Sequence, residues 1–149
     1  MLKIKIKNLD ERQLIIRGNI FKHGLFMLVG LLLLNSFLYN MGVDWATGKW
    51  AELTIILFTI ICCSIEFIYY DIYPLTKSTH KFGILLLGLF GLISIGLCIY
   101  EMQVEKIAFI VNGKVTDDGL GIIFGFMFLS IPAAKLIKSF YVNNKNEED

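Results

Sequence analysis

The chain has 149 residues, and its 14 Lys and Arg residues almost balance its 13 Asp and Glu residues, which leaves a net charge of +1. Nucleic-acid-binding proteins usually have a strong excess of basic residues, so this balance argues against that class of protein. Hydrophobic residues make up 56% of the chain and charged residues 18%, whereas soluble domains average about 45–50% and about 25%. The composition excludes a disordered chain and a disulfide-stapled scaffold, and it favours a membrane protein.

Four long apolar blocks follow one another along the chain, at residues 20–39, 51–70, 82–100 and 119–137. Each is close to the roughly 20 residues that a helix rising about 1.5 Å per residue needs to cross about 30 Å of hydrocarbon. The third block lacks the polar stripe of a soluble amphipathic helix. We therefore predict an all-α integral membrane four-helix bundle. A basic segment, residues 1–19, precedes it, and a polar tail, residues 138–149, follows it. Disorder is expected for residues 143–149 of that tail.

Positive charges predict the orientation of the bundle. Eleven Lys and Arg residues lie before the first span, between the second and third spans, or near and beyond the end of the fourth, and three lie on the opposite side. Segments rich in Lys and Arg stay in the cytoplasm. Both termini are therefore expected to be cytoplasmic.

The segments outside the spans suggest local structure. A helix capped by Asn8 is expected to lie along the membrane surface and to turn into the first span at Gly18 or Gly24. The alternating residues 1–7 suit a flexible basic tail near anionic lipid, or a strand added to a partner's sheet. Residues 107–116 predict a small hairpin, because Asn112-Gly113 suits a type I′ turn.

Glu66 is the most informative residue, because it interrupts the apolar run of the second span. Ionisable residues within a span usually face the bundle interior and indicate a functional site. Lys135 lies at a comparable depth in the fourth span, so a Glu66–Lys135 pair is geometrically possible. We expect a structural ion pair, or two side chains that extend separately toward the headgroups. A site for a proton or an ion near the inner leaflet is the functional alternative.

Small residues predict where helices pack closely. Gly121 and Gly125 form a GxxxG pattern on the fourth span, and Gly88, Gly91 and Ser94 form a similar face on the third. We expect these faces to pack within one chain, although contacts between copies are the alternative. The cysteines and histidines lack metal-ligand spacing and no catalytic motif is recognisable, so no enzyme, cofactor or metal site is predicted.

Two segments near the first span carry a resemblance to a known family. Residues 10–13 read DERQ and residues 17–24 read RGNIFKHG. The chain resembles an uncharacterised family of small multi-pass membrane proteins of low-GC Gram-positive bacteria, which share such a segment. Residues 44–46 and 73–75 agree with the resemblance. It implies the bacterial cytoplasmic membrane, and it carries no activity and no site residue.

These observations lead to two functional hypotheses. The first is a non-enzymatic subunit, regulator or immunity-type factor that acts through a protein partner and binds it through Arg12 and Arg17. The alternative is a small homo-oligomeric transporter or channel, in which Glu66 and Lys135 line the path. In both cases the lipid bilayer surrounds the protein, and no nucleic acid is a partner.

Overall fold

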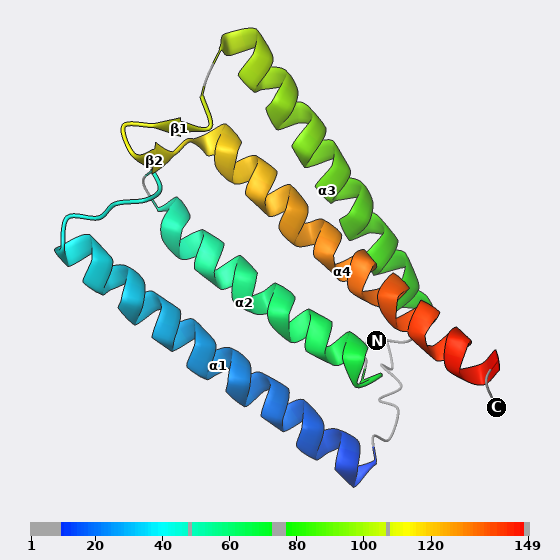
Figure 1. Ribbon diagram of the computed structural model, residues 1–149. Coiled ribbons are helices and arrows are strands. Elements are labelled where there is room, and N and C mark those ends of the chain that lie inside the picture. Colours follow the sequence, from blue (N-terminus) through cyan, green and yellow to red (C-terminus); the bar gives the residue numbers. More distant parts are fainter. Residues whose placement is uncertain (1–9, 48, 73–76, 107, 148–149) are drawn as a thin grey trace, which may run out of the picture.

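The computed structural model describes residues 10–47, 49–72, 77–106 and 108–147. The described chain is almost entirely helical (Figure 1). Its helices and strands are α1 Glu11–Asn40, α2 Trp50–Tyr69, α3 Lys77–Glu105, β1 Ile110–Val111, β2 Lys114–Val115 and α4 Asp117–Glu147. All four helices are long and apolar enough to cross a membrane, which confirms the all-α prediction.

Two predicted boundaries are wrong. Helix α1 begins at Glu11 and continues through Gly18 and Gly24, so no turn separates a surface segment from the first span. A glycine costs a helix only about 1 kcal/mol, which a helix of this length can absorb. Helix α4 continues to Glu147, so residues 143–147, which were expected to be disordered, are helical. Residues 1–7, with their alternating pattern, and the expected cap Asn8 lie outside the described residues.

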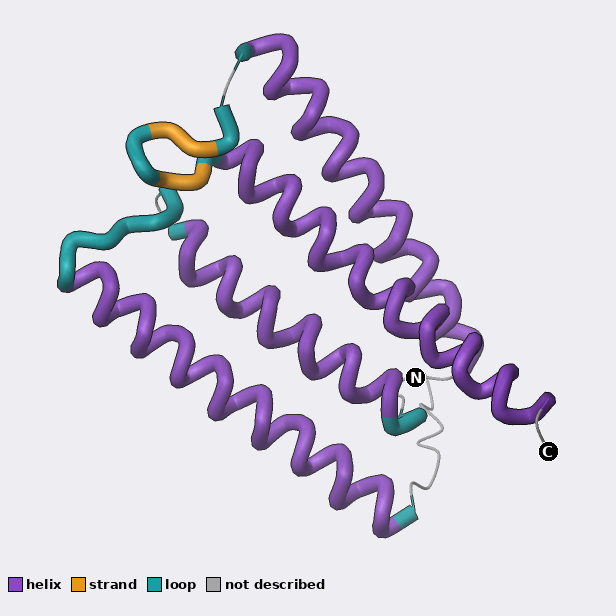
Figure 2. Tube along the Cα trace, in the orientation of Figure 1, coloured by secondary structure: helices purple, strands orange, loops and turns teal. Residues whose placement is uncertain are grey.

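The helices lie side by side in the order α1, α2, α4, α3 (Figures 1 and 2). Helix α1 packs extensively on α2 alone, and α4 packs on both α2 and α3. A closed four-helix bundle would require α1 to pack against a second helix, so the predicted bundle is replaced by an open row. We call the end with the start of α1 and the end of α4 the termini end, and the opposite end the hairpin end.

Packing is strongest between α3 and α4, where glycines allow the two backbones to approach closely. A methyl group on Gly91 would lie 2.8 Å from the carbonyl oxygen of Gly125, and one on Gly125 would lie 2.8 Å from the carbonyl oxygen of Gly91. Ser94 donates a hydrogen bond of 3.0 Å to the carbonyl oxygen of Gly121. The small-residue faces therefore pack within one chain, as expected.

Three apolar clusters hold the row together. One joins α2, α3 and α4 through Ile61, Ile68, Ile84 and Ile131. A second joins α1 to α2 through Ile20, Phe67 and Ile72, and a third joins the loop after α1 to α2 and α4 through Ala46, Ala51 and Leu120. Only Ile20 and Gly24 of α1 are buried. Helix α1 is thus an edge helix that attaches along one side.

The predicted hairpin is confirmed at the hairpin end. Strands β1 and β2 are antiparallel, with Ile110 opposite Val115 and Val111 opposite Lys114. Asn112 has φ 52° and Gly113 has φ 78°. Positive φ at both central residues is the requirement of a type I′ turn, which matches the twist of the two strands.

Candidate functional site

Polar contacts fasten the hairpin end. Lys114 in β2 forms an ion pair with Asp44, in the loop that follows α1. Thr47 of the same loop donates a hydrogen bond of 2.5 Å to Asp117, the first residue of α4. The indole of Trp45 donates a hydrogen bond of 2.8 Å to Asn35 of α1. These contacts tie the loop, the hairpin and α4 together, which is a structural role.

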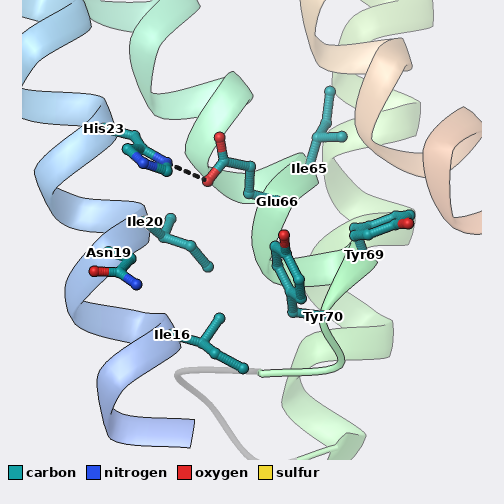
Figure 3. A pocket seen from close by; sticks show the side chains of 8 residues that line it. All are labelled: Ile16, Asn19, Ile20, His23, Ile65, Glu66, Tyr69 and Tyr70. Atoms are coloured by element: carbon teal, nitrogen blue, oxygen red, sulfur yellow. Dashed lines mark ion pairs between the residues drawn. The ribbon is translucent and has the colours of Figure 1, made fainter. Parts of the chain in front are cut away.

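The termini end holds the candidate site, at Glu66. Its carboxylate oxygen lies 3.7 Å from Nδ1 of His23 on α1. The two side chains extend toward one another across the space between α1 and α2 (Figure 3). The pair is an ion pair only while the imidazole is protonated. Of the two arrangements considered for Glu66 and Lys135, the structure has separate side chains, because Glu66 faces α1 and pairs with His23.

A cavity of about 400 Å³ lies beside this pair. Residues of α1 and of the last turn of α2 line it: Ile16, Asn19, Ile20, His23, Ile65, Glu66, Tyr69 and Tyr70. The hydroxyl of Tyr70 is directed toward Glu66, whereas the Tyr69 ring points away from α1 (Figure 3). The side chain of His23 is 69% exposed and that of Glu66 is 39% exposed, so the cavity is an open groove.

Lys138, and not Lys135, forms the polar contact between α4 and α2. Its ammonium donates hydrogen bonds of 2.8 Å to the carbonyl oxygen of Ile68 and 2.9 Å to that of Tyr69, and it lies 2.6 Å from the carboxylate of Asp71. The last carbonyl groups of a helix lack partners within the helix, and a lysine ammonium satisfies them well. Lys138 thus caps α2, while Lys135 is half-buried and has no polar contact with Glu66.

The end of α2 is reinforced by its own backbone. The amide of Asp71, at φ 57°, bonds the carbonyl oxygen of Ile68, and the amide of Ile72 bonds that of Phe67. This pair of bonds is a Schellman motif, and Ile72 and Phe67 supply the apolar contact that accompanies it. These contacts fix the conformation of the C-terminal end of α2, beside Glu66.

Arg12 and Arg17 lie on α1 near the termini end, apart from Glu66. Arg12 is exposed. The guanidinium of Arg17 lies 5.7 Å from the ring centroid of Phe21, which packs edge-on against Phe67 at 5.5 Å. A cation above an aromatic ring is held by the ring quadrupole. Arg17 is therefore partly fixed against α2, while Arg12 is open to a partner.

Sequence reasoning identified Glu66 and missed His23 and Lys138. His23 lies near the middle of α1. Its pairing depends on which face of α1 meets α2, and the spacing of residues along one helix does not define that face. Within the described residues, no group of three His, Cys, Asp or Glu side chains is arranged to hold a metal ion. Cys62, Cys63 and Cys98 are free thiols.

Comparison of the chain with protein-family models, with curated proteins and with solved structures finds no match. The resemblance carried by residues 10–13 and 17–24 therefore stays a prediction.

Proposed function

We propose that this is a non-enzymatic protein of the bacterial cytoplasmic membrane that acts through a protein partner, as a subunit, a regulator or an immunity-type factor. Both termini are cytoplasmic in this proposal, because basic residues are concentrated at the termini end. The four helices that are long enough to cross a membrane support the location.

The observation that carries the proposal is the position of α1. This helix packs extensively on α2 alone and buries only Ile20 and Gly24, so most of its circumference meets the surroundings. Large apolar side chains on that surface include Leu25, Phe26 and Leu33, each more than 60% exposed. A helix of a partner membrane protein can pack there without displacing any helix of this chain.

Charge supports the same partner. Arg12 is exposed at the termini end of this edge helix, and Arg17 lies just above it with its guanidinium over Phe21. A partner that packs on α1 within the membrane and presents carboxylates at its cytoplasmic border would satisfy both the apolar and the basic parts of this surface. An arginine binds a carboxylate through two parallel hydrogen bonds, which gives such an interface its register.

The test is cross-linking in native membranes, followed by affinity purification and identification of the retained proteins. We expect a stoichiometric partner that is lost when Arg12→Gln and Arg17→Gln are combined, while membrane insertion is unchanged. Lys49→Gln, which removes an exposed charge at the hairpin end, is the matched control and should retain the partner. Equal capture by all variants would remove the main support for the proposal.

A second candidate is a small homo-oligomeric transporter or channel, and the groove beside Glu66 favours it. His23, rather than Lys135, is then the residue that shares the path with Glu66. Purified protein in proteoliposomes would show proton or cation flux, and Glu66→Gln would change that flux. Flux no greater than that of empty liposomes would exclude this candidate under the gradients applied.

A further inference from the structure

A shallow trough lies along α2, on the side where α1 and α4 flank it, and two open cavities mark it. The first, of about 400 Å³, is the groove beside Glu66. The second, of about 360 Å³, lies nearer the hairpin end and is lined by Leu31, Thr54, Ile55, Phe58, Ile123 and Met127, from α1, α2 and α4. Phe58 of the second cavity and Ile65 and Tyr69 of the first are spaced by seven and four residues, so they share one face of α2. The two cavities therefore follow one another along that face.

The two halves of the trough differ in chemistry. The half nearer the hairpin end is apolar, because Thr54 has its hydroxyl bonded at 2.7 Å to the carbonyl oxygen of Trp50 and the other residues described around it carry apolar side chains. The half at the termini end holds Glu66, and the residues that line it include no lysine or arginine. His23 lies 3.7 Å from Glu66 and carries a positive charge only when protonated. The trough therefore presents a carboxylate without a permanent cation.

Glu66 is positioned to bind a cation from outside the chain. It lies three residues before Tyr69, the last residue of α2, and thus within the candidate span. A carboxylate within a membrane is costly unless it meets an opposite charge or water. The side chain of Glu66 is 39% exposed and faces the open groove, so a basic side chain can reach it without displacing any described residue. The hydroxyl of Tyr70 is directed toward Glu66 (Figure 3) and offers a second acceptor to that cation.

Arg12 continues the trough toward the terminus. Arg12, Ile16 and His23 are spaced by four and seven residues, so they lie on one face of α1, and Arg12 is exposed there. Along α1 the trough extends from Arg12 to Leu31, nineteen residues later, which is about 28 Å at about 1.5 Å per residue. This length is close to the roughly 30 Å of bilayer hydrocarbon. A membrane-spanning helix matches it, whereas a small ligand would fill one cavity only.

We propose that the trough binds a membrane-spanning helix of the partner, which places a lysine or arginine on Glu66 and, further toward the cytoplasm, a carboxylate on Arg12. The apolar remainder of that helix packs on Leu31, Phe58 and Met127. The inference rests on the proposed function, since the helix belongs to that partner. It adds the face of this chain that binds and the charges that select the partner.

Model helices test the charge requirement before the partner is identified. The probes are helices of about 20 leucine and alanine residues that carry one lysine, one glutamine or one glutamate about one turn inside one end. Energy transfer in phosphatidylcholine vesicles, from a fluorophore at the C-terminus of the purified full chain, measures their association. We expect the lysine helix to bind about tenfold more tightly than the glutamine helix, and the glutamate helix to bind most weakly. Equal binding of the lysine and glutamine helices would overturn the proposal, and this comparison needs no variant.

Variants of the full chain locate the charge that selects the helix. Glu66→Gln should abolish the preference for lysine over glutamine. Glu52→Gln, which changes an exposed acid at the other end of α2, is the matched control and should keep the preference. A preference that survives Glu66→Gln would overturn the proposal.

Photo-cross-linking identifies the face that binds. Benzoylphenylalanine in place of Phe58 should cross-link the lysine helix. In place of Ile60, which is 55% exposed and lies two residues along on the opposite side of α2, it should form no cross-link. A yield at position 60 that equals or exceeds the yield at position 58, or no product at position 58, would place the helix outside the trough.

Capture from native membranes separates this proposal from the proposed function. A partner that is lost with Arg12→Gln and Arg17→Gln but retained by Glu66→Gln would support the function and overturn the trough. A lysine helix that binds through Glu66, with no partner retained from native membranes, would support the trough and overturn the function.

Discussion

The two outer helix pairs of the row pack in opposite ways. Helices α3 and α4 meet through Gly91 and Gly125, and each glycine lies against the backbone of the other helix. Helices α1 and α2 meet at Gly24 and Ile20, where the neighbouring group is the side chain of Cys63. A groove that contains Glu66 and His23 opens beside this contact. Close backbone packing joins α3 to α4, whereas the looser α1–α2 pair holds the candidate site. The two edge helices are equally exposed, since 11% of the 18-residue apolar window of each is buried.

The largest effect is expected at the α3–α4 contact. Gly125→Ala would place a methyl group 2.8 Å from the carbonyl oxygen of Gly91 and against Ile95, so the helices would have to separate. Overpacking of this kind costs about 2–3 kcal/mol, and unfolding in detergent micelles followed by circular dichroism would measure it. Gly96→Ala, with no atom within 4 Å, is the control, and it should raise the free energy of unfolding by up to about 1 kcal/mol because alanine favours the helix. Similar losses in both variants would contradict the close packing.

Replacing a glycine by alanine at the α1–α2 contact should lower the free energy of unfolding by less than Gly125→Ala does. In Gly24→Ala the new methyl group meets the thiol of Cys63, which can rotate away. We expect a loss of about 1 kcal/mol, at the lower end of overpacking costs. Cys63→Ala should recover part of this loss in the double variant, which a double-mutant cycle would detect. A cost as large as that of Gly125→Ala would show that the two contacts are equally tight.

The cap of α2 distinguishes two lysines that are close in sequence. Lys138→Met removes the donor to the carbonyl oxygens of Ile68 and Tyr69, and it should lower the free energy of unfolding by about 1–2 kcal/mol. Lys135→Met should change stability little, because that side chain makes no such bond. Thermal unfolding of both variants tests this difference. A larger loss of stability in Lys135→Met than in Lys138→Met would show that Lys138 does not cap α2.

The smallest effect is expected where α1 meets the loop at the hairpin end. Asn35→Leu removes the acceptor of the Trp45 indole, and hydrogen bonds between membrane segments contribute about 0.6 kcal/mol on average. Because this bond is the side-chain hydrogen bond described between α1 and the loop, its loss should also increase the mobility of α1. Hydrogen exchange confined to α1 would report that change, and uniform exchange across all four helices would contradict it.

Local sequence patterns predicted much of this fold. Continuous apolar blocks defined four helices, the Asn112-Gly113 pair defined the hairpin, and small residues at helical spacing identified the α3–α4 contact. Each of these features depends on residues close together in sequence. The ends of α1 and α4 were less predictable, since a helix continues beyond a membrane border whenever its backbone bonds are satisfied.

Pairing between helices was the part that the sequence did not define. Glu66 and Lys135 lie at similar depth, yet depth does not fix the rotation of a helix about its axis. In the structure Glu66 faces α1 and meets His23, and the lysine that reaches α2 is one turn further along α4, at Lys138. The open row was also unpredicted, because four apolar helices suit a row and a bundle equally well.

The central claim is that α1 lies at the edge of the row with α2 as its one close neighbour. Cysteine-pair cross-linking in native membranes tests it most directly, with the cross-links located by peptide mass spectrometry of the monomer. Gly24→Cys should cross-link to the native Cys63 on α2. Phe26→Cys paired with Leu92→Cys, at similar depth on α1 and α3, should form no bond within one chain. A cross-link between those two positions would close the row into a bundle and contradict the account.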